Sequence, residues 1–185
     1  GLPRRVADLR VGSGQSALLP DGVTVLLTNA FFVDAGGPGA NSTARGGPSS
    51  VVCFRASSTN NSRVEWRFAA TVAAAEDFPT SQEGPNEAAL ALLGDRTTLL
   101  AVMRTDAGDG VPDHQTHAFL QARSTDGGHG WSKGTRMHGI GCTKPQLMLL
   151  ASGVLVLTGG RPGVFLWETD QLARGPWIRH NLAAI

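Results

Sequence analysis

Two charged residues frame an apolar stretch in the middle of the chain, in the segment GPNEAALALLGDRTTLLAVMRTD. Glu87 stands at the head of the first apolar run, and Arg104 directly follows the second. If the two runs form a hairpin, both charges lie at one rim of the sheet, because antiparallel strands return to the level from which they started. Such a pair would place a proton acceptor beside a guanidinium that binds planar anions.

A second arginine occupies a comparable place further along the chain. Arg161 follows an apolar run in the segment LVLTGGRPG, after two glycines. Two guanidiniums converging on one carboxylate suit planar, bidentate recognition, and each charge-assisted bond is worth about 1.5–3 kcal/mol. The alternative is that Arg104 and Arg161 are surface partners of nearby acids, and that Glu87 only caps the start of a strand.

The segment RSTDGGHGW, residues 123–131, also gathers polar groups, and it has two interpretations. Its hydroxyl, carboxylate and His129 could form an active site, or its side chains could serve the backbone of a tight turn. The turn is favoured, because a short carboxylate accepts backbone N–H groups and glycines permit positive φ angles. We expect the Trp to begin the next strand and pack on the turn, and His129 to be inert. The residues with predicted structural roles are Ser124, Asp126, Gly128 and Trp131.

Two further motifs resemble functional sites and are set aside. The segment GSGQSA, residues 12–17, has the shape of a dinucleotide-binding fingerprint, but no clear strand precedes it and a Pro-Asp-Gly turn follows instead of a helix. The segment DHQTH offers metal ligands, yet a helical histidine pair does not fit a β context. We expect no metal and no cofactor. Candidates in this loop, for metal or substrate contact, are Asp106, Asp109, Asp113, His114 and His117, none of them favoured.

Composition narrows the function classes. The 185 residues carry a formal net charge of +1 without a run of Lys or Arg, so we expect no nucleic-acid or anionic-membrane partner. No apolar run is long enough to span a bilayer. The two cysteines, Cys53 and Cys142, are predicted to be buried free thiols. Sequons at Asn41 and Asn60 favour an extracellular or lumenal location only weakly, and the compartment stays open.

A pattern repeated three times predicts an all-β protein. The segments SALLPDGVTVLL, AALALLGDRTTLLAVM and PQLMLLASGVLVLTGG each read as a hairpin, and each precedes a second hairpin that ends in Trp. The closing tryptophans are Trp66, Trp131 and Trp177. Four strands per unit, over residues ~12–72, ~86–136 and ~143–182, are typical of propeller blades, whereas solenoid repeats usually carry a helix or a shorter strand unit. Since propellers need roughly 4–8 blades, we expect this chain to be part of a longer polypeptide.

The motif Ser124-x-Asp126-x-Gly128-x-x-Trp131 resembles the Asp-box, or BNR repeat, of sialidases, and degenerate copies carry Asn60 and Asp170 at matching places. The segment from Asn86 to Arg104 is similar to the sialidase hairpin in which an Asn-Glu pair opens the innermost strand and an Arg ends the second. The resemblance implies a six-bladed propeller, of which this chain looks like the middle blades. It also implies that Glu87 activates a Tyr nucleophile and that Arg104 and Arg161 bind the substrate carboxylate.

The chain departs from that pattern because it contains no Tyr, so the implied nucleophile lies outside it. The implied first arginine and acid/base Asp would precede Gly1, since Arg4 and Arg5 lie too close to the first repeat. The resemblance thus predicts a segment of an exo-glycosidase that removes terminal sialic acids or related keto-sugar acids from glycans, inactive on its own. Two alternatives stay open: a non-catalytic propeller that binds glycans or proteins, and an Asp-box glycosidase with paired carboxylates, which needs a second acid opposite Glu87.

Overall fold

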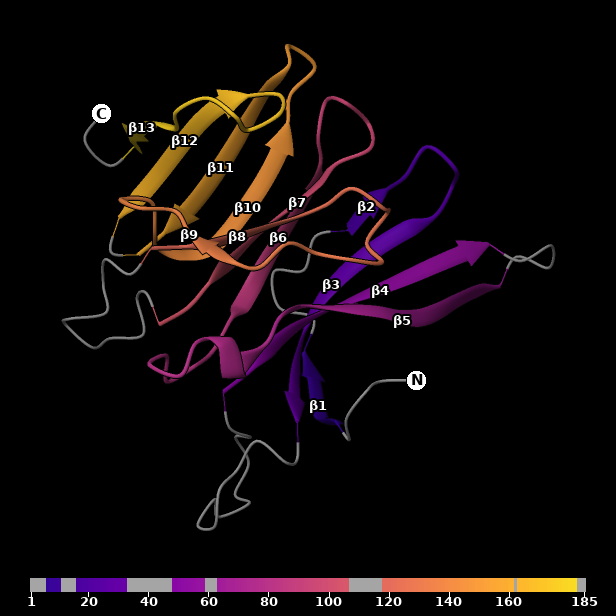
Figure 1. The fold of residues 1–185 in the computed structure, drawn as a ribbon. Helices are drawn as coiled ribbons and strands as arrows, with labels where there is room; N and C mark the ends of the chain where they lie inside the picture. Colours follow the sequence, from indigo (N-terminus) through magenta and orange to yellow (C-terminus); the bar gives the residue numbers. More distant parts are fainter. Residues whose placement is uncertain are drawn as a thin grey trace.

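The computed structural model describes residues 6–10, 16–32, 48–58, 63–106, 118–161 and 163–182, and its regular structure is almost entirely β-strand (Figure 1). The strands form three antiparallel sheets that follow one another along the chain. The first sheet contains β1 (Val6–Arg10), β2 (Ser16–Leu18), β3 (Thr24–Phe32), β4 (Ser50–Ser58) and β5 (Val64–Ala73). The second contains β6 (Asn86–Leu92), β7 (Leu99–Arg104), β8 (Leu120–Ser124) and β9 (Thr135–Arg136). The third contains β10 (Thr143–Leu149), β11 (Val154–Gly160), β12 (Val164–Asp170) and β13 (Ile178–Asn181).

The all-β class predicted from the sequence is confirmed, and the stacked four-stranded sheets are consistent with blades of a propeller. The expected hairpin turns join β2 to β3, β6 to β7 and β10 to β11. Gly22 and Gly153 hold φ angles of 85° and 84° in the first and third of these turns, a conformation that glycine adopts without steric cost. No helix in the described part of the chain is long and apolar enough to cross a membrane.

The first edge of the first sheet differs from expectation. Both β1 and β2 pair with one edge of β3, β1 near its end and β2 near its start, so together they form one interrupted strand. No strand was predicted ahead of residue 12. The strand β1 reads VADLR, with two charges and four exposed residues, so no apolar run marks it in the sequence.

Two other local expectations need correction. Trp131 does not begin a strand: β9 starts only at Thr135, and Trp131 lies in the irregular segment before it, partly buried against the core. Trp66 lies inside β5 and is 44% exposed, whereas Trp177 directly precedes β13 as expected.

The segment 68–78 behaves as predicted in its first half, since β5 runs to Ala73. A short 3-10 turn, η2 (Ala75–Asp77), follows it.

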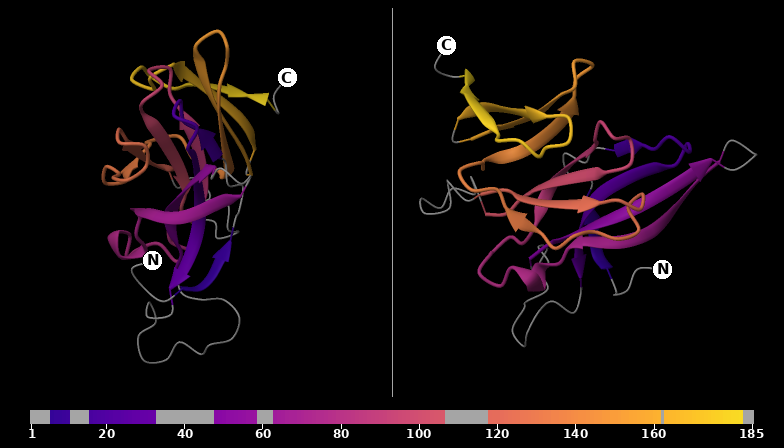
Figure 2. Two further views of the ribbon diagram at one scale, coloured as in Figure 1. Left: turned by 90° about the vertical axis from the view of Figure 1, so that its right-hand side faces the viewer. Right: turned by 45° about the horizontal axis from the view of Figure 1, so that its top comes forward.

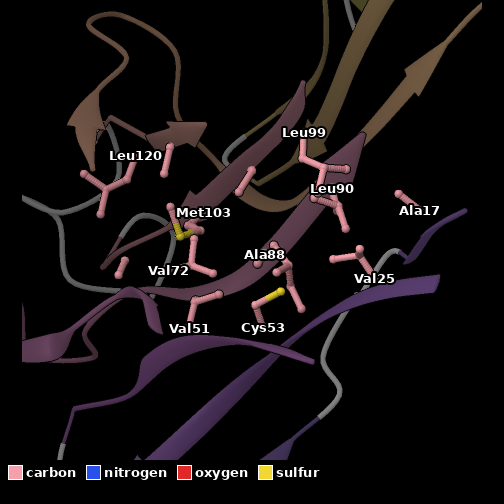
Figure 3. Close-up of a cluster of buried hydrophobic side chains, with 14 of the residues drawn as sticks. Ala17, Val25, Val51, Cys53, Val72, Ala88, Leu90, Leu99, Met103 and Leu120 are labelled. Atoms are coloured by element: carbon pink, nitrogen blue, oxygen red, sulfur yellow. The ribbon is translucent and has the colours of Figure 1, made fainter. Parts of the chain in front are cut away.

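The second sheet lies between the other two, and both of its faces are buried (Figures 1 and 2). One face packs on the first sheet around Cys53, Val25, Leu99 and Met103, as Figure 3 shows. The other packs on the third sheet around Trp167. Burial on both faces explains why β7 reads as a continuous apolar run, with all six residues buried. Cys53 and the Cys142 of the second interface are buried and free, which confirms the thiol prediction.

Candidate functional site

The β6–β7 hairpin brings Glu87 and Arg104 together, as the sequence pattern predicted. Asn86, the first residue of β6, is the register partner of Arg104, the last residue of β7. Arg104 Nη1 lies 3.5 Å from Glu87 Oε1, and the two side chains are 7% and 22% exposed. The charges therefore form an ion pair that is mostly shielded from solvent, where attraction between charges is stronger than on an open surface.

A β-bulge orients the Glu87 side chain. Between the pairs Asn86–Arg104 and Ala89–Val102, β6 carries one residue more than β7, and Glu87 in this bulge has a φ angle of 43°. A non-glycine residue in this left-handed region costs of order 1–3 kcal/mol, so its surroundings must hold it there. Bulges redirect side chains near functional sites. Here the redirected carboxylate also reaches the next sheet, where Glu87 Oε2 accepts the backbone N–H of Lys144 at 2.8 Å.

Arg104 has a closer carboxylate partner than Glu87, which the sequence analysis did not identify. Its Nη2 lies 2.8 Å from Glu83 Oε2, and its Nη1 donates to Asn86 Oδ1 at 3.4 Å. Asn86 Nδ2 donates in turn to Glu83 Oε2 at 3.3 Å. The guanidinium is thus held between two carboxylates and an amide. The signal in the sequence was the Gly-Pro turn between Glu83 and Asn86, which returns an acid to the head of the strand.

Buried hydrogen bonds fix the loop that carries Glu83. Asp106 is 2% exposed, and its Oδ1 accepts both the Ser81 hydroxyl and the Glu83 backbone N–H at 2.9 Å. The Glu83 carbonyl accepts the Ser49 backbone N–H at 2.8 Å. Gly84 holds a φ angle of 70°, and a Cβ there would lie 2.2 Å from the Ser49 carbonyl oxygen, so only glycine fits. Asp106 therefore positions the loop from the interior, and the other loop candidates, Asp109, Asp113, His114 and His117, lie outside the described residues.

These groups form one wall of a cavity of about 430 Å³ between the first and second sheets. The first sheet contributes Arg10, Asn29 and Phe31. Arg10 Nε donates to Asp8 Oδ2 at 2.7 Å, and the Arg10 guanidinium carbon lies 4.8 Å from the centroid of the Phe31 ring. The remaining lining residues are Pro48, Ser49, Gln82, Glu83, Asn86, Glu87 and Arg104. Arg10 was not predicted as a site residue, because no strand was predicted over β1.

Arg161 lies outside this cavity. Its side chain is exposed, its φ angle is 55°, and among the described residues no hydrogen bond or ion pair of its side chain is present. The register explains the position. The pair Thr143–Gly160 of the third sheet corresponds to Asn86–Arg104 of the second, with the same bulge following each, so Gly160 takes the place of Arg104. Arg161 comes one residue later.

The polar groups of residues 123–131 serve the backbone of their turn. Asp126 Oδ1 accepts the Gly130 N–H at 2.9 Å and the Ser124 hydroxyl at 2.8 Å, and Ser124 Oγ accepts the Gly128 N–H at 2.9 Å. The Gly130 N–H contributes most to lowering the pKa of the Asp126 carboxyl. Trp131 Nε1 donates to the Gly128 carbonyl at 3.3 Å.

The matching turn of the third sheet uses the same device, since Asp170 accepts the N–H groups of Leu172 and Arg174 at 2.8 and 3.0 Å. Asn60, at the corresponding place of the first repeat, lies outside the described residues. His129, expected to be chemically inert, contacts the first sheet, where its Nε2 is a partner of Arg55 Nη1.

A second cavity of about 420 Å³ lies between the second and third sheets, and it shares no residue with the first. Trp167, Trp177, Arg136 and Arg179 are among its lining residues, and its lining holds one histidine, His138, but no carboxylate to pair with it. A site for proton transfer needs titratable groups close together. The cavity beside Glu87 therefore carries the stronger candidate site.

Comparison with known proteins supports the fold but no family. No protein-family model matches the sequence, and no curated protein matches it. Among solved structures, a protein of unknown function from Dyadobacter fermentans has a TM-score of 0.67 at 16% identity over 92% of this chain. Zg3597, a family 117 glycoside hydrolase from the marine bacterium Zobellia galactanivorans, has a TM-score of 0.64 at 11% identity over 97% of this chain. The K499G mutant of NanB sialidase from Streptococcus pneumoniae has a TM-score of 0.53 at 14% identity over 91% of this chain.

At identities of 11–16%, these likenesses show the fold alone. The chain spans 41%, 59% and 23% of the length of the three structures, in the order given above. The fold of this chain is thus one that a glycoside hydrolase and a sialidase share.

Proposed function

We propose that this chain forms part of the substrate site of an exo-glycosidase that removes terminal sialic acids or related keto-sugar acids from glycans. The observation that carries the proposal is the Glu87–Arg104 ion pair in the wall of a polar cavity. In this proposal Glu87 takes the proton of a Tyr nucleophile supplied from outside the chain, and Arg104 binds the substrate carboxylate. Arg161, the second predicted carboxylate ligand, lies outside the cavity, so it would act only if a longer polypeptide extends the site toward it. The fold shared with a glycoside hydrolase and a sialidase supports the reaction class.

The size and polarity of the cavity fit a sugar. Small-molecule sites usually occupy roughly 300–1,000 Å³, and about 430 Å³ lies in the lower part of that range. Carboxylates, guanidiniums and the Asn29 and Asn86 amides line the cavity, and these groups exchange hydrogen bonds with hydroxyl-rich ligands. Phe31 adds an apolar surface on the first sheet.

A second candidate is a glycosidase that uses paired carboxylates, and Glu83 is the observation that favours it. Glu83 lines the same cavity as Glu87 and contacts the same guanidinium. Two carboxylates with different surroundings are the usual acid and base of glycoside hydrolysis. A third candidate, a non-catalytic glycan-binding propeller, is favoured by the engagement of both oxygens of Glu87, with Arg104 and with the Lys144 N–H.

All three candidates require that the cavity binds a sugar, and ligand binding by the 185-residue chain tests this requirement. We expect saturation-transfer NMR to show binding of N-acetylneuraminic acid, and weaker binding of its methyl ester, which has lost the carboxylate charge. If the chain binds neither the acid nor the ester, the proposal is wrong.

Hydrolysis then separates the candidates. With the nucleophile outside the chain, the isolated 185 residues should not release 4-methylumbelliferone from its sialoside. If the isolated chain does release 4-methylumbelliferone, and both Glu83→Gln and Glu87→Gln abolish this release, the mechanism uses paired carboxylates and not a Tyr nucleophile. The third test uses a longer polypeptide that includes this chain. If it binds the sugar but does not hydrolyse the sialoside, the non-catalytic glycan-binding propeller is the candidate that remains.

A further inference from the structure

We infer that Arg10 and Glu83 are the charged groups that contact the ligand in this cavity, and that Glu87 and Arg104 form the support beneath them. The inference rests on one part of the proposed function, that the cavity takes an acidic sugar. It replaces the substrate contacts given there to Glu87 and Arg104 by contacts with two residues outside the predicted site. One comes from the innermost strand of the first sheet, and the other from the loop before the innermost strand of the second.

Arg104 is already occupied. Its side chain is 7% exposed, with Glu83 Oε2 at 2.8 Å from Nη2, and Glu87 Oε1 and Asn86 Oδ1 at 3.5 and 3.4 Å from Nη1. A ligand carboxylate at this guanidinium would be the third carboxylate around one cation. Repulsion between like charges in a shielded site disfavours that arrangement.

Glu87 is occupied as well, because one oxygen faces Arg104 and the other accepts the Lys144 N–H. Glu83 differs in this respect. Both of its side-chain contacts, with Arg104 and Asn86, use Oε2, and its side chain is 37% exposed. Among the described residues Oε1 has no partner. This oxygen is therefore available to accept hydrogen bonds from ligand hydroxyls.

Arg10 has the opposite character to Arg104. Its side chain is 50% exposed, and its Nε donates to Asp8. Its Nη1 and Nη2 have no hydrogen-bond partner among the described residues. The Phe31 ring, 4.8 Å away, lies against the guanidinium, and such stacking limits the orientations of its plane. An arginine held in this way offers two parallel N–H donors, the geometry that a carboxylate accepts.

The two groups together define the ligand chemistry. Arg10 and Glu83 line one cavity from neighbouring sheets, with Asn29, the register partner of Arg10, beside them. A ligand that satisfies both carries a carboxylate at one end and hydroxyl donors at the other. A sugar acid of monosaccharide size has this composition, whereas a neutral sugar offers no carboxylate to Arg10 Nη1 and Nη2, the nitrogens that Asp8 does not contact.

The test measures binding by the whole 185-residue chain with two probes, N-acetylneuraminic acid and its methyl ester. We expect Arg10→Ala to weaken binding of the acid at least about tenfold and to leave the ester nearly unchanged, because only the acid presents a charge to Arg10. Arg10→Lys should recover part of the affinity, since the charge remains and the planar fork is lost. Glu83→Gln should weaken both probes, because hydroxyl donors are common to both.

Arg136→Ala is the matched control, since this exposed arginine lines the other cavity and should leave both affinities unchanged. Thermal unfolding of each variant shows whether the fold is retained. Acid binding by Arg10→Ala at wild-type affinity would overturn the inference and leave the proposed function standing. Equal weakening of acid and ester by Arg10→Ala would also overturn it. A wild-type chain that binds neither probe would instead defeat the proposed function.

Discussion

The carboxylate of Glu87 accepts the backbone N–H of Lys144 at 2.8 Å, and the two residues occupy the same position of the same bulge in neighbouring sheets. Both have positive φ angles, 43° for Glu87 and 52° for Lys144. A bulge leaves a residue outside the regular ladder of its own sheet, so its N–H needs another acceptor. The side chain of one repeat supplies that acceptor for the next. The candidate site therefore includes a residue, Glu87, that also connects the second sheet to the third.

Two replacements of Glu87 should show how much its contacts with the Lys144 N–H and with Arg104 contribute to stability. Glu87→Ala removes the acceptor of the Lys144 N–H and one partner of Arg104, so we expect the free energy of unfolding to fall by about 1–3 kcal/mol. Glu87→Gln keeps a carbonyl oxygen that can accept the Lys144 N–H, so its free energy of unfolding should fall by less. Urea unfolding followed by tryptophan fluorescence measures both variants.

The control for this pair of variants is Glu65→Ala, at the exposed Glu65–Arg67 ion pair. Exposed ion pairs contribute about 0–1 kcal/mol, so this variant should stay near wild type. If Glu87→Ala loses no more stability than Glu65→Ala, the Glu87 contacts do not join the sheets.

Gly128 should tolerate no side chain, for two separate reasons. Its φ angle is 92°, and a Cβ would lie 3.1 Å from Cys53 Sγ and 3.4 Å from Val25 on the first sheet. Gly22 has a similar φ of 85°, but a Cβ there would meet nothing within 4 Å. Gly128→Ala should therefore destabilise more than Gly22→Ala, by about 1–3 kcal/mol for overpacking at the sheet interface. Chemical denaturation of both variants measures the difference, and equal losses would show that the contact with the first sheet is unimportant.

Repetition made the fold predictable, and register made part of the site predictable. Apolar runs bounded by turn residues identify β6 and β7, and a hairpin of that length must return Arg104 to the level of Glu87. The strand β1 left no such trace, because its residues are mostly exposed and its pairing depends on the far end of β3. Arg10 was missed with it.

The role of Glu83 could not be read from the sequence for a different reason. Its placement depends on a buried Asp106 and on Ser49 of the first sheet, contacts that join residues far apart in the chain. Such tertiary contacts carry no local pattern. The position of Arg161 is a more local matter. It depends on a one-residue offset within the third sheet, which only the observed pairing of Thr143 with Gly160 reveals.

Asp95 should make stability depend on pH in the acid range. Partial burial raises the pKa of its carboxyl, but hydrogen bonds from Thr98 and Thr97 outweigh that effect and lower the pKa to about 2. In the unfolded chain the pKa is about 3.9, so folding favours the ionised form. The stabilisation is thus present above about pH 4 and is lost as the pH falls from about 4 to about 2.

The variant Asp95→Asn removes this titration, so its stability deficit relative to wild type should shrink as the pH is lowered through that window. Urea midpoints of both proteins at pH 7, 4 and 2.5 measure the change. Asp21→Asn is the control, because Asp21 occupies the corresponding turn of the first sheet and accepts only the Val23 N–H among the described residues. A deficit for Asp95→Asn that stays constant with pH would contradict the assignment.

Neither cysteine should react with a thiol reagent while the protein is folded. Burial raises the pKa of Cys53 and of Cys142 to about 12, so both remain protonated at pH 8, and only the thiolate attacks a disulfide reagent. Both side chains are fully shielded in the interfaces between sheets, so reaction also requires those interfaces to open. We expect Ellman's reagent to detect no thiol in buffer and two in guanidinium chloride. The variant Cys53→Ala should release one thiol on unfolding. Rapid labelling of Cys142 in the native chain would show that the second and third sheets separate readily, because its side chain is buried in the core cluster that residues of both sheets share.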